Sequence, residues 1–265
     1  MAFTDIHSHI LPGFDDGARD EEEFLAMARR ALEGGTGRLA ATPHCDLEDP
    51  ASRWRDVRHA VRVSQDLLSS RGLHLELVPG LEVRVNSALY RMAREGGDLD
   101  LLALGENGKY VLVDLPLMDL PAPTPDVLFM IQLRGFTPIL AHPERNRLLS
   151  DRLQVVRDLR ERGIEIQVNS GSLSGLYGRR ARKAGWELLE GGTARLVASD
   201  AHQEEGRGPD LSGTYRLLRR RLGEEAARLL LETNPSLVLE GKSLHDLPET
   251  RGRKGRLSRP SSASP

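Results

Sequence analysis

The sequence contains a single cysteine, Cys45, and has no long apolar run. One cysteine excludes a disulfide within the chain, which fits a reducing compartment such as the cytoplasm. No stretch approaches the roughly 18 uninterrupted apolar residues that would predict a membrane span. The N-terminal residues also lack the basic and then apolar pattern of a signal peptide, because Asp5 and His7 interrupt it. These absences predict a cytoplasmic protein without a membrane span.

Acidic residues are missing from the C-terminal end of the chain. Residues 251–265 contain five basic residues and no acidic one, among serine, proline and glycine. This composition predicts a basic, disordered tail over residues 249–265, so we expect one domain over residues 1–248. The net charge of the whole chain is −2, so residues 1–250 carry −7. An acidic body argues against broad affinity for nucleic acid.

Short β-rich runs alternate with longer helical patterns along the chain. The helix over Asp20–Glu33 has clear signals, with acidic residues in its first turn and Gly34-Gly35 at its end. Seven successive strand-and-helix units predict a parallel sheet and, at this length, a closed or nearly closed α/β barrel. An open, doubly wound sheet is the alternative, but no glycine-rich phosphate loop follows the first strand.

The predicted strands are Phe3–His7, Arg38–Thr42, Leu73–Val78, Tyr110–Leu115, Thr137–Ala141, Glu165–Asn169 and Arg195–Ser199. The predicted helices between them are Asp20–Glu33, Trp54–Arg71, Ser87–Glu95, Pro125–Arg134, Asp151–Arg162 and Arg179–Glu190. Two more helices are expected to close the domain before Asn234-Pro235, near Ser212–Leu222 and Glu224–Thr233.

Histidines and carboxylates gather where the predicted strands end. Five of the eight histidines lie at this edge, where barrel enzymes place their active sites: His7, His9, His44, His142 and His202. Four carboxylates share the edge: Asp16, Glu82, Asp114 and Asp200. Each residue alone could be a turn former or a solvated charge, but the nine together predict a polynuclear metal site. Nitrogen and oxygen donors without a thiolate suit manganese, iron or zinc.

The dipeptide His44-Cys45 could indicate a different chemistry, in which a cysteine thiolate is the nucleophile. It resembles the start of the cysteine-phosphatase loop, in which the nucleophilic cysteine is followed by five residues and an arginine. Ala51 stands at the arginine position, and no glycine-rich phosphate cradle lies between the two. We therefore do not expect Cys45 to act as a thiolate nucleophile.

Several motifs, in order, resemble those of the PHP (polymerase and histidinol phosphatase) superfamily: "DIHSHILPGFDDGA", "ATPH", "PGLEV", "YVLVDLP", "PILAHPERN", "QVNSGSL" and "VASDAH". The resemblance covers most of the predicted domain and implies a distorted seven-stranded (β/α)₇, TIM-like barrel with a trinuclear metal site. "HSHILPGFDDGA" and "AHPERN" are most similar to the bacterial, manganese-dependent protein-tyrosine phosphatases of capsule and exopolysaccharide synthesis.

The resemblance also implies roles for individual residues. One metal ion would be held by His7, His9, Glu82 and Asp200; a second by Glu82 as a bridge with Asp114 and His142; and a third by Asp16, His44 and His202. Arg145 and Arg207 match the phosphate-binding arginines, a role that suits a planar guanidinium. Asp114 stands where this branch usually has glutamate, so its shorter side chain could weaken or reposition the second ion.

The implied reaction is hydrolysis of phosphotyrosine by a water that bridges two Mn²⁺ ions, loses a proton and attacks phosphorus. Arg145 and Arg207 would hold the phosphoryl oxygens. The expected partner is a phosphotyrosine protein, namely a membrane-associated bacterial tyrosine kinase that controls polysaccharide export. A small-molecule phosphatase such as histidinol phosphatase is the main alternative. A nuclease or proofreading module and a non-catalytic binding protein are further alternatives, which the acidic body and the complete set of ligand positions respectively disfavour.

Overall fold

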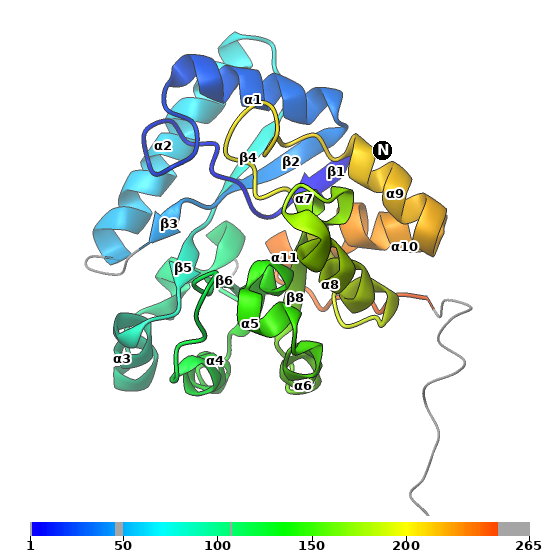
Figure 1. The fold of residues 1–265 in the computed structure, drawn as a ribbon. Coiled ribbons are helices and arrows are strands. Elements are labelled where there is room, and N and C mark those ends of the chain that lie inside the picture. Colours follow the sequence, from blue (N-terminus) through cyan, green and yellow to red (C-terminus); the bar gives the residue numbers. More distant parts are fainter. Residues whose placement is uncertain (1, 46–49, 107, 249–265) are drawn as a thin grey trace, which may run out of the picture.

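The computed structural model describes residues 2–45, 50–106 and 108–248. Within these residues nine strands pair in parallel in two sheets, and helices cover them from outside (Figure 1). The predicted tail, residues 249–265, lies outside the described residues, and a domain boundary at residue 248 stays a prediction. None of the helices in the described part of the chain has the length and apolar composition needed to cross a membrane.

The two sheets together form one ring of strands. The smaller sheet has the order β1-β2-β4, with β1 (Phe3–Asp5), β2 (Thr36–Ala41) and β4 (Glu76–Pro79). The larger sheet has the order β3-β5-β6-β7-β8-β9. Its strands are β3 (His44–Cys45), β5 (Glu82–Arg84), β6 (Tyr110–Asp114), β7 (Thr137–Ala141), β8 (Glu165–Asn169) and β9 (Leu196–Ala198).

Two of the strand positions around the barrel are each occupied by a pair of consecutive short strands. Only Thr42 and Pro43 separate β2 from β3, and only Gly80 and Leu81 separate β4 from β5. Proline has no N–H to donate to a neighbouring strand, so Pro43 interrupts the sheet hydrogen bonds between the end of β2 and the start of β3. When β2 with β3 and β4 with β5 are each counted as one strand, the barrel has seven strands. The predicted seven-stranded barrel is confirmed, whereas β3 and β5 were not predicted.

The ring closes through the residues that follow β1 and β9. The backbone N–H of Asp200 donates to the His7 carbonyl at 2.9 Å, and that of His9 donates to the Ala201 carbonyl at 2.8 Å. Ser8 and Ala201 form a parallel bridge at the same place. The first strand therefore ends at Asp5 rather than at the predicted His7, because the histidine segment pairs with the end of the last strand instead.

The predicted helices occur in the predicted order, with different bounds in several cases. The α-helices of the described residues are α1 (Glu21–Glu33), α2 (Pro50–Ser70), α3 (Ser87–Glu95), α4 (Thr124–Leu133), α5 (Arg147–Ser150), α6 (Leu153–Glu161), α7 (Ser170–Ser174), α8 (Gly178–Glu190), α9 (Ser212–Leu222), α10 (Glu224–Arg228) and α11 (Asn234–Leu239). All of these helices except α11 lie outside the strands. Short 3₁₀ helices are η1 (Leu99–Leu102), η2 (Leu104–Glu106) and η3 (Pro143–Arg145), and a short π-helix is η4 (Leu229–Thr233).

Helix α1 shows how the local sequence signals act. The Asp20 side chain accepts a hydrogen bond from the Glu23 backbone N–H at 2.9 Å and caps the helix. The acidic first turn faces the positive end of the helix dipole. Phe24, Leu25 and Ala28 form an apolar stripe that is buried against the barrel.

The helix predicted near Glu224–Thr233 is present, but its predicted end before Asn234-Pro235 is wrong. The chain stays helical through η4, a π turn, and continues as α11. A wider turn just before Pro235 leaves room for a residue that lacks the N–H of a regular helix. The buried Asn234 does not end the helix. Its Nδ2 donates to the Arg195 and His245 carbonyls, at 3.1 and 2.9 Å.

Helix α11 closes the inside of the barrel at the end away from the predicted metal ligands. Its Val238 and Leu239 pack in one buried cluster with Ile6 and with strand residues such as Leu112 and Ile139. Alternate residues of β6, β7 and β9 belong to this cluster, and the residues between them belong to the larger cluster under the outer helices. The interior is therefore apolar at one end, and the polar side chains meet at the carboxyl ends of the strands.

Candidate metal centre

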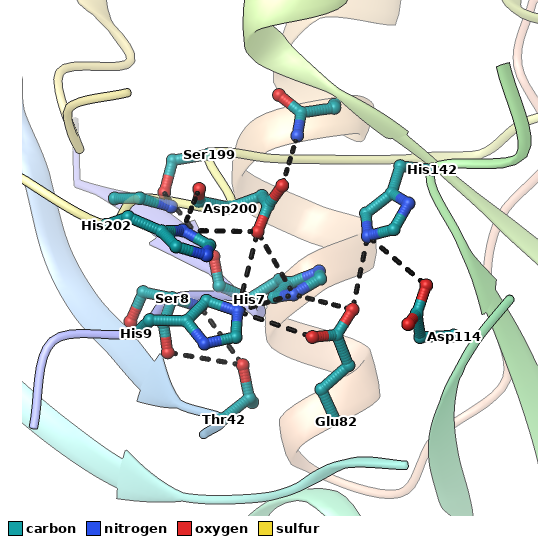
Figure 2. A network of polar contacts seen from close by, with 12 residues as sticks. His7, Ser8, His9, Thr42, Glu82, Asp114, His142, Ser199, Asp200 and His202 are labelled. Atoms are coloured by element: carbon teal, nitrogen blue, oxygen red, sulfur yellow. Dashed lines mark hydrogen bonds and ion pairs between the residues drawn. The ribbon is translucent and has the colours of Figure 1, made fainter. Parts of the chain in front are cut away.

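The predicted ligands converge at the carboxyl ends of the strands, and most of them appear in Figure 2. His7 and His9 follow β1 with both rings on the same side of the backbone, because side chains two residues apart in an extended chain face the same way. Ser8, between them, points the other way and donates from Oγ to the Ala40 carbonyl at 2.7 Å. The three histidines that were not expected at this edge, His59, His74 and His245, are exposed elsewhere.

Three overlapping groups of side chains could each hold a metal ion. In each group the potential ligand atoms lie within 4.8 Å of one another. The groups are His7, His9 and Asp200; His7, Glu82 and His142; and His9, Asp16, His44 and His202. Eight of the nine predicted residues thus come together. The exact division of ligands among three ions stays a prediction.

Asp114 is the predicted ligand that belongs to none of these groups. Its Oδ1 lies 3.9 Å from His142 Nε2, and its Oδ2 lies 2.8 Å from Arg84 Nη2. The salt bridge to Arg84 therefore occupies one oxygen of the carboxylate. Burial and the neighbouring Glu82 charge raise the pKa of Asp114. Its role as a metal ligand remains a prediction.

Glu82 lies at the centre of the cluster and is almost fully buried. Its Oε1 is 3.2 Å from His7 Nε2 and 3.1 Å from His142 Nε2. Its Oε2 is 3.3 Å from His9 Nε2 and 2.8 Å from His44 Nδ1. This oxygen has no hydrogen bond of good geometry among the described residues, although it is buried. A carboxylate ringed by four imidazoles fits the bridging position between cations.

The rings of His7 and His9 are turned so that both Nε2 atoms face the cluster. Their Nε2 atoms lie 3.3 Å apart. His9 Nδ1 donates to Asp15 Oδ2 at 2.7 Å, and His7 Nδ1 donates to Gln167 Oε1 at 3.1 Å. With Nδ1 protonated, each Nε2 offers a lone pair toward the same point. Two lone pairs directed at each other fit a shared cation, so these residues suit the metal site that the sequence predicts.

The pKa shifts show how strongly the carboxylates act on the rings. Burial alone would lower the pKa of His142, but the hydrogen bond to Glu82 and the charges of nearby carboxylates raise it to about 9. Burial and the neighbouring His9 charge lower the pKa of His202 to about 4. Burial opposes ionisation of Glu82, yet the surrounding histidines hold its pKa well below its usual value. Protons and a divalent cation therefore compete for the same donors, and metal binding should weaken as pH falls.

Asp15 is a residue whose role the sequence analysis missed. Besides its bond to His9, it accepts from the His44 backbone N–H at 2.9 Å and from the Gly17 N–H at 3.0 Å. The hydrogen bond to His9 holds the Asp15 pKa at about 2 despite burial. The one signal that could have indicated it is a second aspartate beside Asp16, which is equally typical of an ordinary turn.

The turn that carries Asp15 depends on glycine at position 17. The backbone N–H of Ala18 donates to the His9 carbonyl at 3.0 Å, which folds the loop back onto the first strand. A Cβ at Gly17 would lie 1.9 Å from the same carbonyl oxygen. Glycine alone permits this close approach, which places Asp15 against His9 and Asp16 beside His44 and His202.

We expect Asp15→Ala to lower metal affinity about 10- to 100-fold, because His9 loses the partner that fixes its tautomer and orientation. Competition with a chelator of known affinity measures this change. Excess metal should restore most of the activity, since Asp15 itself is not a predicted ligand. Asp20→Ala, at the cap of α1, is the matched control and should leave metal affinity unchanged. Equal metal affinity in the wild type and Asp15→Ala would contradict this role.

Arg145 and Arg207 both reach the cluster through Asp200. Arg145 Nη1 donates to Asp200 Oδ2 through a short hydrogen bond, and Arg207 Nη2 donates to the same oxygen at 3.1 Å. The Tyr177 ring lies 4.0 Å from the Arg145 guanidinium carbon and supports its flat face. Asn169 Nδ2 also donates to Asp200 Oδ2, at 2.7 Å. The two predicted phosphate-binding arginines are therefore next to each other and to the metal cluster.

The backbone is strained at two of the predicted ligands. His142 and Asp200 adopt positive φ angles, 32° and 53°, which residues other than glycine rarely take. Each lies directly after a strand, β7 or β9, so the unusual backbone angle turns its side chain toward the barrel axis. Strain of this kind clusters at functional sites.

A cleft of about 440 Å³ opens over the cluster. Its walls include both arginines and the predicted ligands Glu82, His142 and Asp200. The segment that follows β6, residues 115–118, forms the apolar part of the wall. A charged cleft of this size can admit a phosphorylated side chain. Cys45, by contrast, is buried and does not line the cleft.

Comparison with known proteins agrees with these features. Residues 3–240 match a family described as capsular polysaccharide synthesis, CpsB/CapC. The tyrosine-protein phosphatase YwqE of Bacillus subtilis is 31% identical over 257 residues, which cover 96% of this chain and 98% of that protein. The tyrosine-protein phosphatase CpsB of Streptococcus pneumoniae is 25% identical over 245 residues, or 89% and 97% of the two chains.

Solved structures give the same result. A crystal structure from work on YwqE of Bacillus subtilis and CpsB of Streptococcus pneumoniae superposes with a TM-score of 0.81 and 31% identity. The match covers 92% of this chain and 96% of that one, and those proteins are described as metal-dependent tyrosine phosphatases. Dihydropyrimidinase from Brevibacillus agri matches with a TM-score of 0.55 at 12% identity, over 91% of this chain and 71% of that one. This more distant likeness shows a shared barrel fold alone.

Proposed function

This chain belongs to the CpsB/CapC family of capsular polysaccharide synthesis, and we propose that it is a metal-dependent protein-tyrosine phosphatase. The observation that carries the proposal is the placement of Arg145 and Arg207 beside the His and carboxylate cluster, at one cleft. Relatives named as tyrosine-protein phosphatases align over nearly the whole chain. They favour this activity over the small-molecule phosphatase, the nuclease and the non-catalytic alternatives.

We propose three metal ions, with Mn²⁺ as the native metal, held by the nine residues that the sequence analysis named. When bound, such ions lower the pKa of a water molecule and offset the negative charge of a phosphoryl group. The donor set of imidazoles and carboxylates suits manganese and also admits iron or zinc. The outer residues Asp15 and Gln167 would keep the imidazole nitrogens aimed at the ions.

The chain's own cationic residues would bind the phosphoryl group. Arg145 and Arg207 can each donate charge-assisted hydrogen bonds to phosphoryl oxygens above Asp200. These donors would stabilise the extra negative charge that develops on the oxygens in the transition state. A phenolate is a good leaving group, so the reaction has less need of a dedicated general acid than hydrolysis of an alkyl ester.

The proposed substrate is a phosphotyrosine on a membrane-associated bacterial tyrosine kinase that controls polysaccharide export. The family's link to capsular polysaccharide synthesis supports this partner. We also propose a cytoplasmic location, which the single cysteine supports because it fits a reducing compartment.

A substrate panel tests the proposed activity. We expect the protein with added Mn²⁺ to hydrolyse a phosphotyrosine peptide faster than a phosphoserine peptide of the same sequence or histidinol phosphate. Released inorganic phosphate is the measurement, and a parallel series with chelator is the control. Preferential hydrolysis of histidinol phosphate would replace the protein phosphatase with a small-molecule phosphatase. No metal-dependent release from any of the three would refute the phosphatase proposal.

A further inference from the structure

The cleft over the metal cluster has one apolar wall. The apolar residues that line the cleft are consecutive in the sequence, Leu115, Pro116, Leu117 and Met118. The other ten lining residues are all ionisable. Leu117 and Met118 expose 43% and 65% of their surface, whereas Leu115 is buried beneath them. This segment, the apolar wall, therefore offers accessible apolar surface in a cleft that is otherwise charged.

The apolar wall is tied to the element that carries Arg145. The side chain of Asn146, the next residue, donates from Nδ2 to the carbonyls of Pro116 and Asp119, at 2.7 Å each. The backbone N–H of Arg147 donates to the Leu117 carbonyl at 2.8 Å. Asn146 is itself buried. These bonds fix the position of the apolar wall relative to the guanidinium.

We propose that Leu117 and Met118 receive the aromatic ring of an aryl phosphate while Arg145 and Arg207 hold its phosphoryl group. The inference rests on the proposed phosphatase function and names the part of the cleft that selects the substrate. Transfer of a phenyl ring from water to an apolar surface lowers the free energy of the system. The single methylene of phosphoserine has little such surface. The apolar wall thus favours aryl over alkyl phosphates by binding the ring.

Phenylphosphonate and methylphosphonate form a matched pair of probes, because they share the phosphonate and differ in the apolar group. Calorimetric titration of the metal-loaded, full-length protein is expected to show about 10-fold tighter binding of phenylphosphonate. Binding of the ring should also give the more negative heat-capacity change. Leu117→Gln with Met118→Gln should remove most of this preference and leave the affinity for methylphosphonate unchanged.

Phe129→Gln with Leu133→Gln is the matched control. Both residues lie on α4, are 54% and 62% exposed, and do not line the cleft, so both affinities should stay as in the wild type. Equal binding of the two phosphonates by the wild type would overturn the inference. An unchanged preference in the wall variant, or a parallel loss of both affinities, would overturn it as well. Because binding is measured without turnover, a failure here is distinguishable from an absence of phosphatase activity.

Discussion

Alanine at either His7 or Asp200 is expected to lower turnover of a phosphotyrosine peptide by roughly a thousandfold or more and to reduce the metal bound per chain. The two residues are far apart in sequence, yet His7 Nε2 lies 3.5 Å from Asp200 Oδ1 in the buried cluster. A metal ion that stabilises transition-state charge contributes several kcal/mol, and about 1.4 kcal/mol corresponds to a tenfold change in rate. Elemental analysis and steady-state kinetics on both variants measure the two effects.

The surface histidine His59 and the buried Cys45 supply the controls for that experiment. His59→Ala on α2 should keep full metal content and activity, because its side chain is exposed away from the cluster. Cys45→Ala should stay active, and chelator should abolish activity until Mn²⁺ is added back. Full metal occupancy in both His7→Ala and Asp200→Ala would remove these residues from the ligand set. Chelator-resistant turnover that disappears in Cys45→Ala would show that the metal interpretation is wrong.

The barrel could be predicted from the sequence because its signals are local and repeated. Each strand-and-helix unit shows its own periodicity, and seven parallel units leave few ways to bury both faces of the sheet. The breaks at Pro43 and Gly80 were missed because the flanking strands, β3 and β5, are too short to show any periodicity. The continuation into α11 was missed for a different reason. Asn234-Pro235 is a strong local stop signal, but the long-range hydrogen bonds of Asn234 override it.

The candidate ligands could be predicted because parallel strands all present their carboxyl ends at one edge. A histidine or carboxylate just after a strand therefore meets its counterparts from distant parts of the chain. The residues that orient these ligands could not be found in this way. Gln167 lies inside β8 and reaches His7 across the barrel, so only the packing of distant strands brings them together. Tyr177 supports Arg145 from a turn that has no periodic pattern.

Asp114 shows where the resemblance and the structure differ in detail. Asp114 Oδ1 lies 3.9 Å from His142, farther than any distance between Glu82 and its four imidazoles. Glutamate, one methylene longer, would reach farther from the same strand end. Arg84 holds the other carboxylate oxygen of Asp114. A cation at this position would therefore have to compete with the Arg84 salt bridge for the shorter side chain.

Arg145→Ala is expected to lower kcat/KM for a phosphotyrosine peptide by about 30- to 1000-fold, equivalent to roughly 2–4 kcal/mol. The reason is the loss of one charge-assisted contact to the phosphoryl group from an arginine whose side chain is only 12% exposed. Arg145→Lys should recover only part of the rate, because an ammonium cannot make the bidentate contact of a guanidinium. The measurements are steady-state kinetics, the inhibition constant of inorganic phosphate, metal content and melting temperature. Inhibition by phosphate should weaken in parallel with kcat/KM.

The bond from Arg145 to Asp200 provides a specific alternative, in which the arginine only positions a metal ligand. The two roles differ in what Arg145→Ala changes. A positioning role predicts reduced metal content and rescue by excess metal, with phosphate inhibition unaffected once metal is restored. A phosphate-binding role predicts full metal content and no rescue, because Asp200 keeps Arg207 and Asn169 as partners. Arg147→Ala, an exposed neighbour on α5, should leave all four measurements unchanged. A lower melting temperature with unchanged kinetics would instead place Arg145 in the scaffold and leave Arg207 to bind phosphate.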